Sequence, residues 1–223
     1  MMRRLILSLL TCWIALSATA QRADIRQLFL SMPSSVMPSL SKEWKEELLN
    51  KYDAQKEGRT YTLKEIPYSP TSTSADIRMI TKDYLELKLD ESTSFQLKVL
   101  PKGWWGYRIS IVLTSEIVPW QSVLLFYDQQ WQRLETSHYF TFPTLTQFFT
   151  DSELLSRNET KRVLSEIGTL AYSHHWSPTE PLLTTKITTF DLPLYQKEYP
   201  ESKQWLKVDG VTYQWRRGQL RSH

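Results

Sequence analysis

Apolar residues in the first part of the chain recur at helical spacing. They lie three or four positions apart, at Ile25, Leu28, Phe29 and Met32. Asp24 precedes this run, and Gln27 follows Asp24 by three residues, which is a capping-box pattern. Pro33 cannot continue a helix because it has no backbone N–H. The pattern therefore predicts a short helix that ends before Pro33.

A second apolar stripe predicts a longer helix after a turn-like segment. Its members share one helical face and are Trp44, Leu48, Leu49 and Tyr52. Ser41 is placed to cap the helix, Glu43 suits its first turn, and Glu57 and Gly58 mark its end. Together the two helices predict a helical hairpin.

The period of the pattern changes from helical to alternating after the Ser/Thr/Pro-rich loop of residues 68–74. Apolar and polar residues alternate in three segments, and residues 123–128 form a fourth, apolar segment. The alternating apolar positions are Leu85, Leu87 and Leu89, then Phe95, Leu97 and Val99, then Tyr107, Ile109, Ile111 and Leu113. This pattern predicts a four-stranded antiparallel meander packed on the helical hairpin.

The second half repeats the order of helix and then strand. Ser156 and Glu159 form a capping box ahead of a helical stripe at Val163, Leu164, Ile167 and Leu170. Residues 182–190 are strand-like, and Asp209-Gly210 predicts a hairpin. Its apolar face would hold Leu206, Val208, Val211, Tyr213 and Trp215. The expected fold is α+β, with residues 21–135 and 136–223 as two similar tandem halves; unrelated halves remain the alternative, because the order recurs without sequence identity.

Two blocks of sequence resemble motifs of a known family. They are ADIRQLFLSMPSSVMPSL (23–40) and ITKDYLELKLDESTSFQLKVLP (80–101). They are similar to a secreted Bacteroidales family of unknown function, domain of unknown function 3256, whereas residues 51–78 depart from its pattern. The resemblance implies helices on an antiparallel sheet, similar to β-lactamase-inhibitor-like and PepSY-like periplasmic modules, which act by binding. It brings no known catalytic residues.

The N-terminal segment predicts export. Arg3 and Arg4 precede an apolar run from Leu5 to Leu16, and small residues follow it. Such a pattern is typical of a secretory signal peptide over residues 1–20, cleaved before Gln21. The apolar run is too short to span a bilayer, so we expect no transmembrane segment after cleavage, with a retained anchor as the alternative. The expected location is the periplasm or cell surface of a Gram-negative bacterium.

Composition narrows the chemistry of the mature chain. Cys12, the only cysteine, lies in the signal segment, so a disulfide framework and a thiolate nucleophile are excluded; a lipidated Cys12 is the alternative. Removing Arg3 and Arg4 from 27 basic residues leaves 25 against 24 acidic residues. That balance gives no electrostatic case for nucleic acid. Phosphate loops and metal-binding motifs are absent from the sequence, so we expect no cofactor and no metal.

Tryptophans near predicted turns are the candidate binding residues. They are Trp104, Trp105, Trp120 and Trp131. Tryptophan dominates binding hot spots, so together they could form a recognition surface for an envelope protein or peptide, more than for a glycan. The alternative is that the GWWG tryptophans cover the end of the core.

His174 and His175 are the alternative site. Adjacent imidazoles could serve a hydrolase at the junction of the two halves if the backbone there is a loop, whereas a strand or helix would point them apart. We expect a surface loop at this point. At the C-terminus, Arg216, Arg217 and Arg221 could contact anionic head groups or form a solvated strand end. The sequence thus favours an exported, non-catalytic binding protein, with an envelope hydrolase as the alternative.

Overall fold

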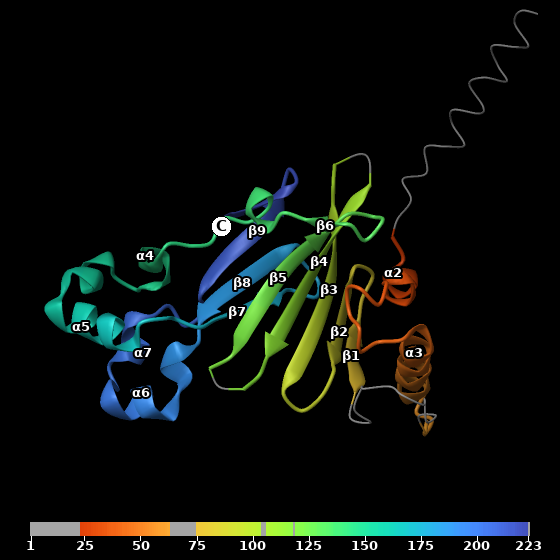
Figure 1. The fold of residues 1–223 in the computed structure, drawn as a ribbon, viewed down its shortest axis with the longest axis horizontal. Coiled ribbons are helices and arrows are strands. Elements are labelled where there is room, and N and C mark those ends of the chain that lie inside the picture. The colour runs from red at the N-terminus through yellow and green to blue at the C-terminus, as the bar shows by residue number, and fades with distance from the viewer. Residues whose placement is uncertain (1–22, 63–74, 104–105, 118, 223) are drawn as a thin grey trace, which may run out of the picture.

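The computed structural model describes residues 23–62, 75–103, 106–117 and 119–222 of the chain (Figure 1). The predicted signal peptide, Cys12, Trp104 and Trp105 lie outside these residues. In the described part, two helices precede a six-stranded antiparallel sheet, the large sheet. Further helices lie at one end of a four-stranded antiparallel sheet, the small sheet (Figure 1). The predicted α+β class is confirmed.

The predicted helical hairpin is present as α2 (Ile25–Ser31) and α3 (Lys42–Lys56). The Ser41 hydroxyl accepts a hydrogen bond from the Trp44 backbone N–H, as the sequence predicted. The Asp24 carboxylate also caps its helix, but it accepts from the N–H of Arg26 rather than from that of Gln27. Arg26 and Asp53 form a two-bond ion pair between the helices, which ties them together.

The large sheet is a meander in the order β1-β2-β3-β4-β5-β6. Its strands are β1 (Asp76–Ile80), β2 (Tyr84–Lys88), β3 (Thr93–Pro101), β4 (Tyr107–Ser115), β5 (Gln121–Tyr127) and β6 (Arg133–Leu134). The sequence predicted four strands and missed both edge strands. A register shift between Ile77 and Met79 breaks the alternation of β1, and β6 has only two residues, too few to show a period.

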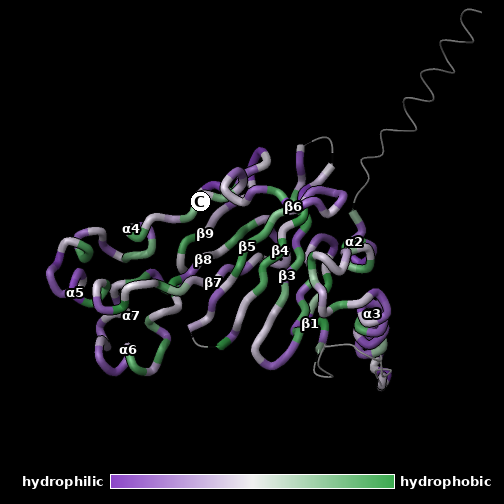
Figure 2. Tube along the Cα trace, in the orientation of Figure 1, coloured by the Kyte–Doolittle hydropathy of each residue, from purple (hydrophilic) through white to green (hydrophobic). Residues whose placement is uncertain are grey.

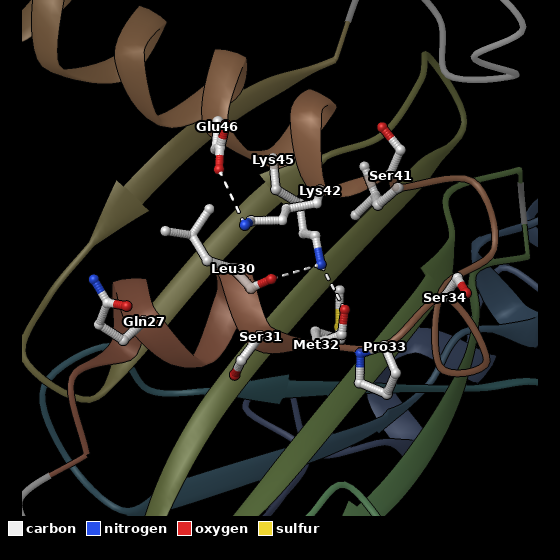
Figure 3. A pocket seen from close by; sticks show the side chains of 11 residues that line it. Gln27, Leu30, Ser31, Met32, Pro33, Ser34, Ser41, Lys42, Lys45 and Glu46 are labelled. Carbon is white, nitrogen blue, oxygen red and sulfur yellow. Dashed lines mark hydrogen bonds and ion pairs between the residues drawn. The ribbon is translucent and has the colours of Figure 1, made fainter.

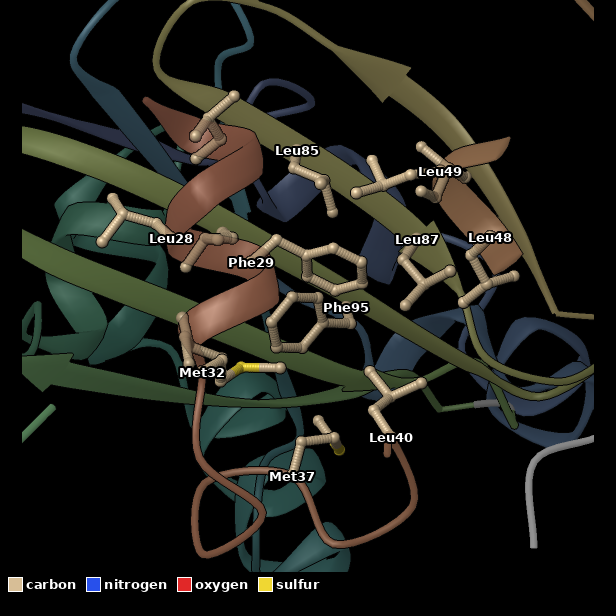
Figure 4. Close-up of a cluster of buried hydrophobic side chains, with 14 of the residues drawn as sticks. Leu28, Phe29, Met32, Met37, Leu40, Leu48, Leu49, Leu85, Leu87 and Phe95 are labelled. Carbon is tan, nitrogen blue, oxygen red and sulfur yellow. The ribbon is translucent and has the colours of Figure 1, made fainter. Parts of the chain in front are cut away.

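Helices α2 and α3 cover one face of the large sheet mainly through apolar side chains (Figure 4). At the edge strand β1, Lys51 of α3 also forms an ion pair with Asp76, and the Tyr52 hydroxyl accepts a hydrogen bond from the Ile80 backbone N–H. Phe29 of α2 and Leu48 of α3 are fully buried against Leu87 and Phe95 of the strands. These are the helical stripes and alternating positions that the sequence pattern indicated. Figure 2 shows the same pattern along the chain, with apolar residues recurring in the strands and polar residues on the outer turns of α3.

The second half contains short helices beside the small sheet, whose order is β10-β9-β8-β7. The helices are α4 (Leu145–Phe148), α5 (Asn158–Ile167), α6 (Pro193–Glu198) and α7 (Ser202–Trp205). The strands are β7 (Tyr172–Trp176), β8 (Leu182–Ile187), β9 (Val211–Arg216) and β10 (Gln219–Ser222). Helix α5 begins without the predicted capping box, because Ser156 belongs to a preceding 3₁₀ helix and its hydroxyl donates to the Glu153 carbonyl.

The hairpin predicted at Asp209-Gly210 is wrong in its position. The turn that joins two strands is Arg217-Gly218, between β9 and β10. Asp209-Gly210 instead leads the chain into β9, and a Cβ at Gly210 would lie 2.3 Å from the Thr185 carbonyl oxygen, so only glycine fits there. Val208, predicted to face the core, is 84% exposed. The predicted face of Val211, Tyr213 and Trp215 is buried.

The small sheet packs on the side of the large sheet that α2 and α3 leave free (Figure 1). A second apolar cluster joins the two sheets and contains Leu100, Val112, Leu124 and Phe126 of the large sheet with Trp176, Leu183, Tyr213 and Trp215 of the small sheet. All strands of the large sheet precede residue 135, and all strands of the small sheet follow residue 171. The division into two similar halves stays a prediction.

Candidate functional site

The histidine pair lies in strand β7, where the sequence analysis expected a surface loop. The prediction failed because Tyr172-Ser173-His174-His175-Trp176 pairs in register with β8, although its polar residues hide the strand alternation. Successive side chains of a strand point to opposite faces. His174 is therefore buried, at 6% exposed, while His175 faces outward.

The free edge of β7 lies against polar side chains of the large sheet. The backbone N–H of His174 donates to Ser122 Oγ of β5 at 3.0 Å, and that of Trp176 donates to Gln96 Oε1 of β3 at 2.9 Å. Trp176 Nε1 also donates to Ser110 Oγ of β4 at 3.0 Å. A strand edge has a row of unpaired backbone groups that would otherwise need water or another strand. Side chains of β3 and β5 satisfy this edge instead.

The same arrangement continues past the end of β7. Lys98 Nζ donates to the Ser177 carbonyl at 3.1 Å, and Thr81 Oγ1 donates to the Pro178 carbonyl at 3.0 Å. We call the side chains of Thr81, Gln96, Lys98 and Ser122 the docking row. Side chains of the large sheet and of the turn after β1 thus form hydrogen bonds with the backbone of β7 and of the two residues that follow it.

Lys98 is the most deeply buried charge of the docking row. Its side chain is 0% exposed, and its ammonium lies 3.2 Å from Asp83 Oδ2 and over the ring of Tyr84. Burial lowers the pKa of Lys98, and the attraction of Asp83 opposes that shift. Its pairing with a carboxylate and a carbonyl makes the burial of this amine tolerable.

The docking row divides the free face of the large sheet into two parts. On one side lies the second apolar cluster; on the other lies a groove of about 520 Å³ between the two sheets. We call it the interlayer groove. Its charged or ionisable lining residues are Arg78, Glu86, Glu116, His174, His175, Lys186 and Asp209, with Trp120 beside them.

The large-sheet wall of the interlayer groove is held by internal pairing. Glu116 is bonded to Lys88 of β2. Burial alone would raise the pKa of Glu116, but hydrogen bonds from Lys88 and Ser94 and the charges of Lys88 and Arg78 lower it below its ordinary value. Glu86 accepts a hydrogen bond from the Tyr84 hydroxyl at 3.0 Å. Both carboxylates therefore have fixed positions on this wall.

Neither histidine is arranged as a catalytic base. His174 Nδ1 lies 2.9 Å from Thr185 Oγ1, and burial lowers the pKa of His174 to about 4. His175 Nδ1 lies 2.6 Å from Gln96 Nε2. Desolvation lowers the pKa of His175, Glu86 opposes the shift and Lys186 adds to it. Both rings are thus neutral near pH 7 and each is engaged by a neighbouring side chain.

The described residues contain no group of three or more His, Cys, Asp or Glu side chains that could hold a metal ion. His174 and His175 point to opposite faces of β7, so they cannot converge on one ion. The strand geometry therefore removes this pair of adjacent imidazoles from consideration as a metal site.

The described tryptophan candidates do not gather into one surface. Trp120 is 48% exposed and lines the interlayer groove. Trp131 lies on the other face of the large sheet, where its ring packs on Tyr127 and its Nε1 donates to Ser31 Oγ of α2 at 3.4 Å. Of these two, Trp120 alone is placed beside the histidine segment.

A larger pocket, of about 650 Å³, lies between α2 and α3 (Figure 3). Lys45 is buried there, and its Nζ donates to the carbonyl oxygens of Leu30 and Met32 at 3.1 and 2.5 Å. Burial lowers the pKa of Lys45. Since a helix leaves its last carbonyls unpaired, this lysine caps the end of α2. The amine is thereby engaged in holding the helices together.

Comparison with known proteins decides the family. A family model described as "Protein of unknown function (DUF3256)" matches residues 15–220. The chain belongs to this family. No curated protein matches the chain.

A solved structure has a fold similar to that of this DUF3256 chain. A domain of an uncharacterized protein from Porphyromonas gingivalis W83 is similar to this chain with a TM-score of 0.71 and 18% sequence identity. The match covers 89% of this chain and 97% of that one. At this identity the likeness concerns the fold alone. Among the described residues of this family member, no helix has the length and apolarity to cross a membrane.

Sequence reasoning missed the docking row of this DUF3256 chain. Gln96 and Lys98 occupy the polar positions of an alternating strand, which normally face water, but both are buried. The sequence did contain a sign of this burial. Leu100, Val112 and Leu124 are apolar residues on the same face of the strands as Gln96 and Lys98, and they are buried. An apolar residue in the polar phase indicates that both faces of a sheet are covered.

Proposed function

We propose that this protein is an exported, non-catalytic binding protein of the cell envelope of a Gram-negative bacterium, and that it holds a polypeptide segment in the interlayer groove. The observation that carries the proposal is the groove itself. It is open, its walls bear both signs of charge, and an exposed tryptophan stands beside them. Such concave sites with a few fixed polar groups are typical of ligand binding.

A polypeptide fits the groove better than a uniformly charged ligand. Glu86 and Glu116 are anionic, whereas Arg78 and Lys186 are cationic, so a ligand must present charges of both signs. Peptides do so, and their backbone donors and acceptors suit side chains such as Ser94, which lines the same groove. Trp120 offers a flat apolar surface for one side chain of the ligand. A neutral glycan would offer no opposite charge to Arg78 and Lys186 of the groove.

The hydrolase alternative has less support. A serine or threonine nucleophile must be bonded to its base. Within the described residues, the only hydroxyl bonded to either histidine ring is that of Thr185. Thr185 is fully buried, so no substrate reaches it. His175 faces the groove, but its described partner is an amide, which cannot act as a nucleophile.

Export and repetition belong to this proposal as well. The segment of residues 1–20 has the charge and apolar pattern of a signal peptide. Helices precede antiparallel strands twice, in α2 to β6 and in α4 to β8, although α6 and α7 then separate β8 from β9 and β10 in the second part. This order supports an origin from two PepSY-like copies, with the interlayer groove at their junction.

Site-specific photo-crosslinking in the native cell envelope tests the proposal. A photoreactive amino acid replaces Trp120 in the groove, and a second variant carries it at Leu194 of α6, which is 57% exposed and lies outside the groove. We expect a discrete protein adduct from position 120 and none from position 194. Equal adducts at both positions, or no adduct at 120, would contradict the proposal.

Charge reversal sharpens this test. Lys186→Glu changes the groove wall, and Lys197→Glu makes the same change on an exposed position of α6. Loss of one complementary charge pair typically weakens binding by about tenfold or more. The adduct at position 120 should therefore fall in the Lys186→Glu protein and persist in the Lys197→Glu protein. An equal fall in both would show that only net charge matters.

A further inference from the structure

The β9–β10 hairpin gathers three arginines at one end of the small sheet. Gln214 and Arg216 lie two positions apart in β9 and so point to the same face. Arg221 of β10 is paired with Gln214. Arg217 forms the two-residue turn with Gly218. The hairpin geometry therefore brings the three guanidinium groups of a short C-terminal stretch to one place.

These arginines line a single pocket of about 270 Å³ with Gln214 and Ser222. All three arginines are exposed, and no acidic residue lines the pocket. Within the described ranges, none of the ion pairs includes any of them. Elsewhere in the molecule arginine does find a carboxylate, as Arg26 does with Asp53. The hairpin thus holds a cluster of positive charge without a described counter-charge.

The turn conformation adds a second observation. Arg217 has a φ of 52° and Gly218 a φ of 81°. Two-residue turns with both φ values positive favour Asn-Gly or Gly-Gly, since a longer side chain is strained there. An arginine at this position costs stability without any described ion pair in return. Strain of this kind is found where a side chain has a binding role.

The floor of the pocket also holds an unused polar group. The amide oxygen of Gln214 is buried and has no hydrogen-bond partner among the described residues. Buried polar atoms are nearly always paired, by protein, water or ligand. A ligand with a hydroxyl group beside its phosphate, such as a glycerol phosphate headgroup, or a phosphate that keeps one proton would supply the missing donor.

We propose that the pocket of Gln214, Arg216, Arg217, Arg221 and Ser222 binds a phosphate group. The planar, doubly donating guanidinium matches the oxygens of a phosphate, and three of them would neutralise its charge. The site shares no lining residue with the interlayer groove, so it does not depend on the function proposed for that groove.

The contact is with the phosphate group and does not involve insertion of the adjacent tryptophan into a membrane. Trp215 points to the opposite face of β9, where its Nε1 donates to the Pro101 carbonyl at 2.7 Å and its ring stacks on Phe126. The ring is therefore a core residue. Binding at this hairpin depends on charge and should weaken as salt concentration rises.

Two probes distinguish the possible sources of the phosphate. The mature chain is mixed with vesicles of phosphatidylcholine containing phosphatidylglycerol or with vesicles of phosphatidylcholine alone, and separately with inorganic phosphate in a thermal-shift assay. Binding to the anionic vesicles only assigns the site to a lipid headgroup, whereas a phosphate-dependent rise in Tm assigns it to a small phosphate compound. Either result supports the site, and the absence of both overturns it.

A matched pair of triple variants locates the binding. The pocket variant combines three substitutions that remove the charge of the pocket: Arg216→Gln, Arg217→Gln and Arg221→Gln. The control variant removes three positive charges from exposed positions elsewhere: Arg133→Gln, Lys161→Gln and Lys197→Gln. The pocket variant should bind anionic vesicles about a hundredfold more weakly, since each arginine near a charged surface contributes about fivefold. The control should change only a few-fold. Equal losses in the two proteins would overturn the proposal.

A single variant separates binding from folding. Arg217→Asn places a residue suited to positive φ in the turn, so Tm should rise. The same change removes one of the three guanidinium groups, so phosphate or vesicle binding should fall by several-fold. A protein that is more stable and binds as well as the parent would contradict a role for Arg217 in the site.

Discussion

The two faces of the large sheet are covered in different ways. On one face, α2 and α3 bury apolar side chains against apolar side chains, with Phe29 and Phe95 fully enclosed. On the other face, the docking row uses a hydroxyl, an amide and an ammonium to hold the edge of β7. On the first face the polar contacts lie at the edges of the sheet, where Lys51 pairs with Asp76 and the Tyr52 hydroxyl accepts from the Ile80 N–H. On the second face the polar contacts come from the interior strands β3 and β5 and lie beside the interlayer groove.

This difference explains why only one face generates a candidate site. Apolar contact is non-directional and closes over the whole area it covers. Hydrogen bonds to a strand edge fix where that strand crosses the sheet, so part of the sheet remains uncovered beside it. His175 and Glu86 line the uncovered part.

The largest expected effects come from the enclosed aromatic residue on each face. Phe29→Ala and Trp176→Ala should each lower the free energy of unfolding by about 4 kcal/mol, because both remove a fully buried ring. Urea denaturation followed by circular dichroism measures both. Trp176→Ala also leaves Ser110 without its partner, so a clearly smaller loss there than for Phe29→Ala would contradict the tight packing described for the second face.

The pH dependence of stability should arise on the second face. The pKa of His174 falls from 6.5 to about 4 on folding. Below pH 6.5 the unfolded chain binds a proton that the folded chain does not, so stability is complete above pH 6.5 and is lost as the pH falls. The loss should reach about 3 kcal/mol by pH 4.

Chemical denaturation between pH 7 and pH 4 tests this dependence. A His174→Gln protein should be less stable at pH 7 but should lack this part of the pH dependence. His138→Gln changes an exposed histidine and serves as the control. If His174→Gln and the parent lose stability in parallel, His174 is not the group responsible.

Much of the first face could be predicted from the sequence, because the residues that recur at helical or strand spacing there are also the residues that are buried. The stripes of α2 and α3 and the apolar phase of β2, β3 and β4 all face one core. The docking row could not be predicted, since Gln96 and Lys98 have the pattern of solvent-facing residues, and their partners His175 and Ser177 are each 79 positions away in the chain. A local sequence pattern does not indicate a contact between residues that are so far apart in the chain.

The local structure of the histidine segment differs from the prediction, and the role of these residues as a site stays a prediction. The structure has a groove lined by His174, His175 and Trp120. The histidine segment was assigned to a loop because Tyr172–Trp176 lacks a clear apolar alternation: His174 takes an inward position through its bond to Thr185. The Asp209-Gly210 hairpin failed for a related reason, because the local turn signal was overridden by the pairing of β9 with β8.

A smaller effect should follow from removing the buried ammonium of the docking row. Lys98→Met keeps most of the length of the side chain but leaves the Ser177 carbonyl without its donor. The expected loss is about 2 kcal/mol, the cost of one buried unpaired carbonyl. Lys82→Met, at an exposed position, should change stability by less than about 0.5 kcal/mol. An unchanged or higher stability of Lys98→Met would show that the apolar cluster alone holds the small sheet.

The smallest effect concerns the hydroxyl at the other end of the row. Ser122→Ala removes the acceptor of the His174 backbone N–H and should lower the free energy of unfolding by about 1 kcal/mol. Ser115→Ala, in an exposed position of β4, is the matched control. Comparable Tm values for these two variants would indicate that water replaces Ser122 without loss.

Amide hydrogen exchange along β7 tests the account most directly. The N–H groups of Ser173 and His175 point toward β8, as the alternation of an antiparallel ladder requires, while those of His174 and Trp176 point toward the docking row. We predict that all four amides are protected in the parent. In Gln96→Leu, Trp176 should exchange about tenfold faster while His175 is unchanged. Rapid exchange of His174 and Trp176 in the parent would contradict the claim that side chains of the large sheet hold this edge.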